Sequence, residues 1–399
     1  MGTNASLGLY FTALSLNIPL TPGLCCHMKI LIAEASTAIG GQELAVVRHA
    51  KGVRKRGHDV QLLVQPGSPI EQLALQQEVP IQAVEMSGLT PSALKIFRKI
   101  LRRERPDILH VNSSRDSWLG GIAARLLSPR VKVIKTRHIS APLNRNAATR
   151  LLYRRLFDHI IVTGGRSNER ALVERDGLQA TKVSAFPIGV DLSQFSPGSP
   201  EHDIRGELGL APGDRLVGLL SYLRAYKGHQ YFIEAAALLA HRHPGVRFLI
   251  VGEGPDEMSI RARIAQLGVA REVLMLGYRP DSLSLLRSLD IFVMPSIEGD
   301  TIPQVLLEAM AVGLPVVATT TGSIADVVRN GLTGLLVPPR DSQAISECVE
   351  TLLNDAALRR MLGHNASCLV AKTYSLESML DCLERVYQQV LAQDMNISR

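Results

Sequence analysis

The stretch DIFVMPSIEGDTIPQVLLEAMAVGLPVVAT, residues 290–319, decides the fold. Its apolar runs Ile291–Met294 and Pro315–Ala318 flank the helical sequence VLLEAMAVG at 305–313. Continuous apolar runs of about five residues are typical of parallel strands that are buried on both faces. Two such strands joined by a helix form a right-handed β-α-β crossover. The stretch therefore predicts part of a doubly wound α/β sheet.

The same alternation of strands and helices extends through the chain in both directions. Further apolar runs predict strands at 29–33, 60–64, 108–111, 131–134, 159–162, 216–220, 247–251 and 273–276, with helical patterns such as 42–56 and 91–104 between them. Ten or more strands are too many for one such sheet, and 399 residues fit two domains of ordinary size. Residues 193–214 contain three prolines and four glycines, which indicates the linker between the domains.

The N-terminal segment has the composition of a tail. Residues 1–27 are largely apolar but are interrupted by Pro19 and Pro22, and they contain no charged residue. They lack both the basic start of a signal peptide and the roughly 20 apolar residues of a membrane span. We expect a disordered leader and a cytoplasmic protein.

Charge is distributed unevenly along the chain, whose net charge is +7. Residues 28–200 hold 26 Lys and Arg against 14 Asp and Glu, whereas residues 201–399 hold 18 against 23. Nucleic acid, anionic lipid or an anionic substrate could each explain the basic half. In the predicted helix 92–104, one side gathers Lys95, Arg98, Lys99, Arg102 and Arg103, and the other gathers Leu94, Ile96, Phe97, Ile100 and Leu101. An anionic membrane surface is therefore a candidate partner, and a solvated helix face is the alternative.

Four motifs follow predicted strands, where doubly wound sheets bind their ligands. Gly40-Gly41 opens a helix and suits a phosphate, although a tight turn without a ligand explains it equally well. Val251–Pro255 (VGEGP) is more typical of a structural turn. Arg224 and Lys227 suit a diphosphate, with a solvated surface pair as the alternative. The acids Glu298, Asp300 and Glu308 cluster at one strand-to-helix junction. Glu308 stands among apolar residues, and such an acid is rarely buried without a partner.

Taken together and in order, these motifs resemble one family: the retaining nucleotide-sugar glycosyltransferases of the GT-B fold, glycosyltransferase family 4. The resemblance spans residues 28 to about 391. Its carriers are the Gly40-Gly41 loop, FPIGVDLSQF (186–195), LRAYKGH (223–229), FLIVGEGP (248–255), VLMLGY (273–278), SIEGDTIPQVLLEAMAVGLPVVAT (296–319) and NGLTGLLVPPRD (330–341).

The resemblance implies two facing Rossmann-like domains, with C-terminal helices crossing back to the N-domain. The implied bounds are an acceptor domain at 28–195, a nucleotide-sugar donor domain at 205–375, and a helix at 376–399 that packs on the N-domain. The linker between them would let the domains close and exclude water.

Roles for individual residues follow from the same resemblance. Gly40, Gly41, Arg224 and Lys227 would contact the donor diphosphate, and Glu308 the ribose hydroxyls. His138, in the sequence Lys135-Thr136-Arg137-His138, would lie beside the donor sugar and the reacting centre. The family separates its two acids by seven residues, which selects Asp300, whereas Glu298 would need a reshaped loop. Where the family often has Gly-Arg-Leu, this chain has Ser221-Tyr222-Leu223. Arg224 would therefore have to supply the arginine contact.

The implied activity is transfer of a sugar from a nucleotide-diphosphate sugar to an acceptor hydroxyl with retained configuration. The pathway would be assembly of bacterial cell-surface glycan or lipopolysaccharide. No cofactor and no metal are expected, because the chain has no Asp-x-Asp motif. The expected partners are the donor and a glycan or lipid-linked acceptor, with no nucleic acid. A peripheral location at the inner face of the cytoplasmic membrane would suit a lipid-linked acceptor. A nucleotide-sugar epimerase of the same fold and a non-catalytic sugar-nucleotide binding protein are the alternatives.

Overall fold

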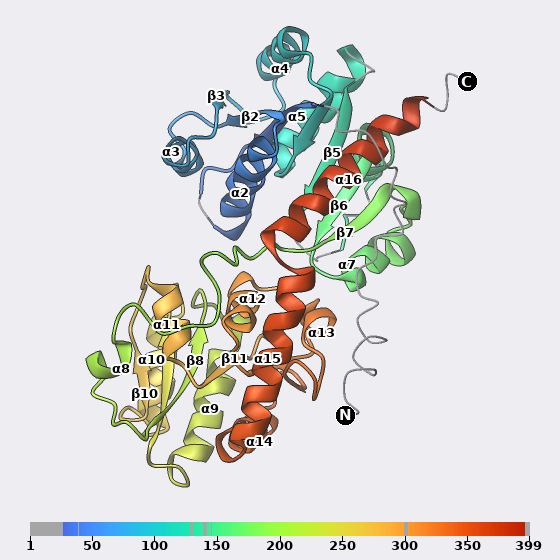
Figure 1. The fold of residues 1–399 in the computed structure, drawn as a ribbon. Coiled ribbons are helices and arrows are strands. Elements are labelled where there is room, and N and C mark those ends of the chain that lie inside the picture. Colours follow the sequence, from blue (N-terminus) through green and yellow to red (C-terminus); the bar gives the residue numbers. More distant parts are fainter. Residues whose placement is uncertain are drawn as a thin grey trace. The chain divides into compact units, whose positions relative to one another are not determined.

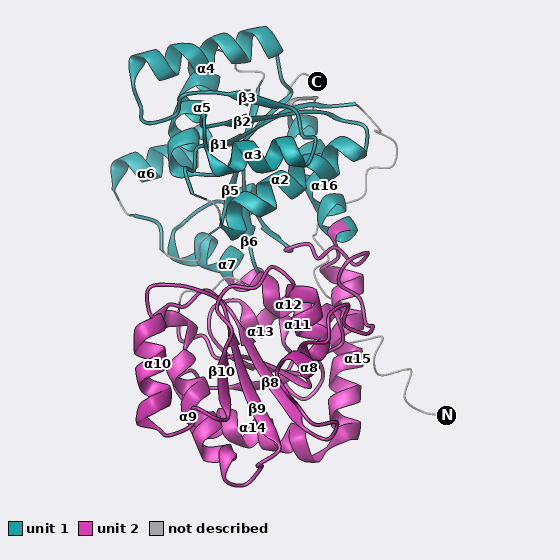
Figure 2. Cartoon of the chain, turned by 90° about the vertical axis from the view of Figure 1, so that its left-hand side faces the viewer, with its two compact units in different colours: residues 1–164, 168–186, 377–399 teal, residues 165–167, 187–376 magenta. Residues whose placement is uncertain are grey.

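The structure, a computed structural model, describes residues 27–38, 40–127, 131–138, 142–144, 146–298 and 302–395. Contacts divide the chain into two compact units (Figure 2). Unit 1 holds the chain up to Gly164, Asn168–Phe186 and the segment from Glu377 onward, and unit 2 holds Gly165–Ser167 and Pro187–Leu376. The predicted leader, apart from His27, and the candidate acid Asp300 lie outside the described residues.

Unit 1 is built on a seven-stranded parallel sheet (Figure 1) with the strand order β3-β2-β1-β4-β5-β6-β7. Its strands are β1 Lys29–Glu34, β2 Asp59–Val64, β3 Ile81–Ala83, β4 Ile108–Val111, β5 Lys132–Arg137, β6 His159–Thr163 and β7 Val183–Phe186. The main helices are α2 Gly41–Lys55, α3 Pro69–Gln76, α4 Pro91–Glu104, α5 Ser114–Leu127, α6 Ala147–Leu151 and α7 Arg166–Arg170. The order reverses between β1 and β4, so the carboxyl ends of these two strands form the place where such sheets bind ligands.

Unit 2 repeats the architecture with six strands in the order β10-β9-β8-β11-β12-β13. The strands are β8 Arg215–Leu220, β9 Val246–Val251, β10 Val273–Met275, β11 Ile291–Met294, β12 Val316–Thr319 and β13 Leu335–Val337. The helices are α8 Ile204–Glu207, α9 His229–Ala240, α10 Glu257–Gln266, α11 Ser282–Ser288, α12 Gln304–Ala311, α13 Ile324–Val327, α14 Ser342–Asn354 and α15 Ala356–Thr373. Here the order reverses between β8 and β11.

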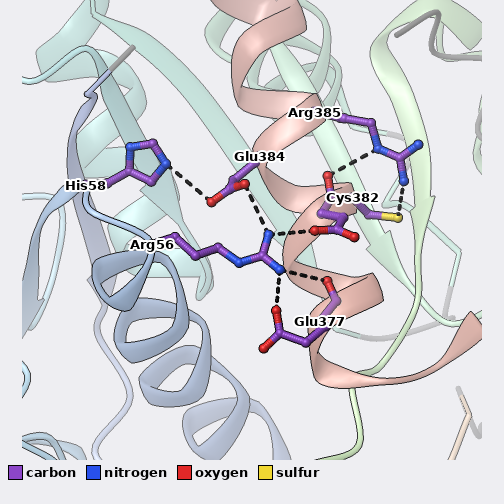
Figure 3. Close-up of polar contacts among 7 residues, drawn as sticks. Arg56, His58, Glu377, Cys382, Glu384 and Arg385 are labelled. Carbon is purple, nitrogen blue, oxygen red and sulfur yellow. Dashed lines mark hydrogen bonds and ion pairs between the residues drawn. The ribbon is translucent and has the colours of Figure 1, made fainter. Parts of the chain in front are cut away.

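The last helix, α16 (Leu376–Met395), returns to unit 1. The Arg56 guanidinium, just after α2, contacts three carboxylates of α16 (Figure 3): Glu377 at 2.5 Å, Asp381 at 2.8 Å and Glu384 at 3.1 Å. Deeper in the unit, the buried Tyr387 hydroxyl lies 2.8 Å from Nδ1 of His110 in β4. These contacts attach α16 to unit 1 by ion pairs at the surface and by a hydrogen bond in the core.

The predicted fold class, two Rossmann-like α/β domains, is confirmed. Every strand predicted from an apolar run is present, with ends shifted by up to three residues. The short strands β3, β7 and β13 are additional. A polar residue interrupts β3 and β7, and β13 has only three residues. The predicted linker, 193–214, belongs to unit 2. It carries α8, whose Arg205 donates to the Ser288 carbonyl at 3.0 Å and pairs with Asp290 at 3.1 Å.

Candidate active site

A cavity of about 560 Å³ opens at the reversal point of the unit 1 sheet. Its walls come from the segments that follow β1, β4 and β5, namely residues 35–38, 112–118 and 135–138, together with the start of α2 and residues near α6. The size is that of a small-molecule site. The parallel strands thus bring three chain segments that are far apart in sequence to one edge of the sheet.

Three buried ionisable side chains lie close together near this cavity, and of these only Lys135 lines it. Asp116 is fully buried and accepts hydrogen bonds from the backbone N–H groups of Ala35 at 3.0 Å and Ser113 at 2.9 Å. The Lys135 ammonium donates to the carbonyls of Asn112 and Ser113. Burial lowers the pKa of Lys135 to about 8, although the charge of Asp116 opposes that shift.

Glu34, at the end of β1, is the third of these groups. Burial and the nearby charge of Asp116 raise its pKa to about 8. Its carboxyl group accepts a hydrogen bond from the Gln42 side chain at 2.6 Å and another from the Ser36 N–H at 3.0 Å. At neutral pH, Glu34 is therefore largely protonated, whereas Lys135 remains mostly charged.

His138 is the first residue after β5, and it lines the cavity. Its Nε2 lies 3.3 Å from Oδ1 of Asn112, and the Asn112 amide group donates to the Ala33 carbonyl at 3.2 Å. Burial, with smaller contributions from His49 and Lys135, lowers the pKa of His138 to about 3. The imidazole is therefore neutral at physiological pH, and it can donate or accept a hydrogen bond in the cavity.

Gly40 and Gly41 begin α2 beside the same cavity. The Gly40 backbone is extended, with φ of −163°, so that any residue could adopt it. A Cβ atom on Gly41 would meet nothing within 4 Å. Neither glycine is therefore required by the local backbone or by packing among the described residues. Their small size leaves the helix N-terminus accessible to a ligand.

In unit 2, Arg224 and Lys227 follow β8, at the reversal point of the second sheet. Arg224 is exposed and lies over the Tyr222 ring at 5.3 Å, and the Lys227 ammonium lies 5.2 Å from the centre of the Tyr226 ring. The Tyr226 carbonyl accepts a hydrogen bond from the Ile297 N–H at 2.8 Å. This bond joins the loop after β8 to the loop after β11.

Gly228 makes the approach of these two loops possible. Its φ is +75°, and a Cβ atom there would lie 1.9 Å from the Pro295 carbonyl oxygen. The VGEGP glycines play a similar part, because a Cβ on Gly252 would lie 1.9 Å from the Ser221 oxygen. A Cβ on Gly254 would lie 2.4 Å from the Leu223 oxygen. The VGEGP motif therefore lets the β8 loop pack closely, which favours its structural reading.

The candidate acids of unit 2 lie in different surroundings. Glu308 is half-buried in α12, where its Oε1 accepts a hydrogen bond from the Gln304 side chain at 3.1 Å. Glu298 is exposed, and its carboxylate lies 3.9 Å from the Arg340 guanidinium. Asp300 belongs to residues 299–301, outside the described part of the chain. The choice between Asp300 and Glu298 therefore stays a prediction.

Sequence reasoning missed most of the unit 1 cavity. Of its polar lining it selected His138, but not Lys135, Arg137, Asn112 or Arg115. One signal was present: Glu34 and Lys135 directly follow the predicted strands 29–33 and 131–134, and charged residues are rarely buried without a function or a partner. Arg115 gives no such signal, since an arginine near a helix start is ordinary surface.

Comparison with known families accounts for both units. Residues 39–194 match the family described as "Glycosyltransferase Family 4", and residues 200–367 match "Glycosyl transferases group 1". The two matches leave only residues 195–199 between them.

Individual proteins show the same similarity. The chain is 27% identical over 384 residues to a D-inositol 3-phosphate glycosyltransferase of Nocardia farcinica, with 86% of this chain and 83% of the relative covered. It is 26% identical over 301 residues to the UDP-Gal:alpha-D-GlcNAc-diphosphoundecaprenol alpha-1,3-galactosyltransferase of Escherichia coli, with 72% and 77% covered. Among solved structures, Anabaena Alr3699/HepE in complex with UDP has a similar fold, with a TM-score of 0.81, 23% identity, and 91% and 100% of the chains covered.

Proposed function

Because the chain belongs to the group 1 glycosyl transferases of the family 4 type, and so is a nucleotide-sugar-dependent glycosyltransferase, we propose that it transfers its sugar with retention of configuration. The donor is a nucleotide-diphosphate sugar, and the acceptor is a hydroxyl of a glycan or lipid-linked saccharide. The observation that carries the diphosphate donor is the position of Arg224 and Lys227 at the reversal point of the unit 2 sheet, in a loop fixed by Gly228 and Tyr226. Retention of configuration is what the resemblance to the family implies.

The chemical task is to stabilise a departing diphosphate while positive charge develops on the sugar. In the proposal, Arg224 makes a bidentate contact with the diphosphate, and Lys227 supplies a compact positive charge. Preorganised charges of this kind stabilise a transition state because they need no reorganisation when the leaving group departs. Glu308 binds the ribose hydroxyls, and either Asp300 or Glu298 contacts the sugar. The acceptor hydroxyl attacks from the face that the phosphate leaves, and the leaving phosphate assists by accepting the proton.

The unit 1 cavity contributes the reacting end of the site in this proposal. Gly40 and Gly41 leave the N-terminus of α2 open to a phosphate oxygen. The neutral imidazole of His138 hydrogen-bonds the sugar or the acceptor hydroxyl. Because cations and helix N-termini carry the charge stabilisation, we propose that transfer requires no metal and no cofactor, so activity should survive chelation with EDTA.

The experiment begins with a thermal-shift screen of UDP-, GDP- and ADP-sugars, since a bound donor stabilises the folded protein by mass action. Release of nucleoside diphosphate is then measured with and without a lipid-linked saccharide acceptor. The proposal expects acceptor-dependent release and an α-linked product from an α-linked donor. Release of nucleoside diphosphate at the same rate with and without acceptor would favour the epimerase. Binding of the nucleotide sugar without release of nucleoside diphosphate would favour the binding protein. No observation in the structure favours either alternative.

The choice of acid is tested by substitution. If Asp300 contacts the sugar, Asp300→Asn abolishes turnover while Glu298→Gln leaves it close to that of the wild type. The opposite result would show that the seven-residue spacing does not apply and that the loop is reshaped.

For the acceptor, we propose a place in cell-surface glycan or lipopolysaccharide assembly. The support is the E. coli relative, whose name specifies a diphosphoundecaprenol-linked acceptor. No helix in the described ranges is long and apolar enough to cross a membrane. We propose that a lipid-linked acceptor is reached from the membrane surface.

Helix α4 is the proposed membrane contact. Lys95, Arg98, Lys99 and Arg102 are exposed on it, while Phe97 and Ile100 are buried against the core. Ile96, which the sequence placed on the buried side, is 41% exposed, so one apolar side chain accompanies the cations. At about 1 kcal/mol for each basic residue near an anionic leaflet, these cations give reversible attachment.

Vesicle sedimentation tests this contact. Binding should be strong on anionic vesicles at low salt and weak on neutral vesicles. It should be lost when Lys95, Lys99 and Arg102 are reversed to Glu. The matched control reverses three exposed arginines elsewhere, namely Arg150, Arg170 and Arg271. An equal loss of vesicle binding in both variants would show that net charge alone causes binding, and it would refute a docking face on α4.

A further inference from the structure

The unit 1 cavity has an excess of positive charge. The ionised side chains that line it are Arg115, Lys135 and Arg137 on the positive side, and Glu43 on the negative side. His138 adds no charge, because burial holds its pKa at about 3. The cavity wall therefore carries three cations against one carboxylate.

Two of the cations are built into the wall. Lys135 is 6% exposed, and its ammonium donates to the carbonyls of Asn112 and Ser113. Arg137 is 8% exposed, and its Nη1 lies 3.4 Å from the Tyr153 hydroxyl. Each has a carboxylate that interacts with it electrostatically, Asp116 for Lys135 and Asp176 for Arg137. Both cations line the cavity, whereas neither acid does.

Arg115 is the third cation, and it differs from the other two. It is exposed in the first turn of α5, and it has no ion pair or side-chain hydrogen bond with any residue in the described ranges. Its long side chain can therefore turn toward a bound group without giving up an existing contact. Glu43 does not balance it, because Glu43 lies in the first turn of α2, where the helix dipole offsets a negative charge.

A planar aromatic side chain completes the wall. Trp118 lines the cavity and is the single tryptophan of the chain. Aromatic faces suit the apolar face of a sugar ring, whereas the cations suit a group that carries negative charge.

From this arrangement we infer that the acceptor carries an anionic group of its own, a phosphate or a carboxylate, which Arg115 and Arg137 bind inside the unit 1 cavity. The inference rests on the proposed function, because it names the class of acceptor for that reaction. Arg115 and Arg137 thereby become determinants of acceptor specificity. The donor diphosphate is assigned to Arg224, Lys227 and the N-terminus of α2 at Gly40-Gly41, so titration in the presence of UDP tests the two anions separately.

Trp118 fluorescence provides the test, since binding in this cavity changes the surroundings of the only tryptophan. The probes are glucose 6-phosphate, glycerol 3-phosphate and gluconate, each compared with its neutral parent, together with inorganic phosphate. Titrations are performed with and without saturating UDP, which occupies the donor diphosphate position. The variants are Arg115→Ala and Arg137→Met, with the exposed Arg150→Ala as a matched control outside the cavity.

The inference expects at least one anionic probe to bind about tenfold or more tightly than its neutral parent, as is typical of charge-assisted hydrogen bonds. That preference should persist with UDP present, should fall about tenfold in Arg115→Ala, and should be unchanged in Arg150→Ala. Because Arg137→Met alters a buried site, its circular dichroism is compared with that of the wild type. If Arg137→Met does not fold, the test rests on Arg115→Ala, which changes a residue at the surface.

Three results would overturn the inference. The first is equal affinity for each anionic probe and its neutral parent. The second is complete displacement of the anionic probe by UDP. The third is an equal loss of probe affinity in Arg115→Ala and Arg150→Ala. Calorimetric binding of UDP to the same protein separates this failure from failure of the proposed function. If UDP binds and nucleotide sugars turn over while no anion is preferred, only the acceptor class is wrong.

Discussion

The substitution Gly228→Ala tests the geometry on which the donor site depends. The new methyl carbon would lie 1.9 Å from the Pro295 carbonyl oxygen, at a backbone φ of +75°. The left-handed conformation alone costs a non-glycine residue about 1–2 kcal/mol. The contact adds to this cost, because the loop after β8 must move by about 1 Å or more before a carbon and an oxygen reach an ordinary separation. That movement displaces Lys227, the preceding residue, from the position proposed for the diphosphate.

Gly268→Ala is the matched control. Its φ is +68°, nearly the same, but a Cβ atom there would meet nothing within 4 Å. Scanning calorimetry should show a loss of about 1–2 kcal/mol for Gly268→Ala and a larger loss for Gly228→Ala. Titration calorimetry should show unchanged UDP affinity in the control and a loss of about tenfold in Gly228→Ala, the size expected for one lost charge-assisted contact. Equal stability losses with wild-type UDP affinity in both variants would refute the reasoning that close packing of the two loops positions the cations.

Four further predictions test separate parts of the account. Arg224→Ala and Lys227→Ala should each weaken UDP binding about tenfold and leave uridine binding nearly unchanged; equal losses for both ligands in calorimetry would contradict a diphosphate contact. Glu308→Gln should lower kcat/KM about tenfold or more, whereas Gln304→Ala, which removes its hydrogen-bonding neighbour, should have a smaller effect; wild-type kinetics in a folded Glu308→Gln protein would contradict the ribose contact. The pKa of Glu34 is raised to about 8, so its contribution to stability is complete below about pH 4.5 and is lost as the pH rises toward 8. The unfolding free energy of Glu34→Gln, measured in denaturant, should therefore fall less over that pH range than that of the wild type. Parallel plots of unfolding free energy against pH for the two proteins would refute the assignment. Arg56→Ala should destabilise unit 1 by about 1 kcal/mol, with a smaller deficit at high salt, because the carboxylates of Glu377, Asp381 and Glu384 in α16 lose their ion pairs with Arg56. A deficit that does not depend on salt would assign the loss to packing.

The sequence was sufficient for the fold because buried parallel strands leave a strong signal. Ile291–Met294 is apolar throughout and Ile108–Val111 is apolar except for His110, and both strands begin and end where predicted. The positions of Arg224 and Lys227 after a strand also followed from the pattern, whereas His138 was selected through the resemblance to the family. Such residues lie at the carboxyl edge of a parallel sheet whatever the details of packing.

The cavity of unit 1 was not predictable in the same way. Glu34 ends β1, Asn112 and Asp116 follow β4, and Lys135 lies in β5, and only the order β1-β4-β5 in the sheet brings them together. The sequence contains each residue but not that neighbour relationship. The VGEGP turn illustrates the same limit, because the need for Gly252 and Gly254 arises from the backbone of residues 221–223, about 30 residues earlier in the chain.

The most direct test of the central claim is turnover by the wild type and by the double variant Arg224→Ala/Lys227→Ala. The donor from the thermal-shift screen is supplied with a radiolabelled sugar, together with an extract of lipid-linked saccharides as acceptor. The account predicts that the wild type forms labelled product and nucleoside diphosphate in equal amounts. The folded double variant should form product at least about 100-fold more slowly, because it loses two charge-assisted contacts that contribute about tenfold each. Absence of transfer by the wild type with every nucleotide sugar, or unimpaired transfer by the double variant, would contradict it.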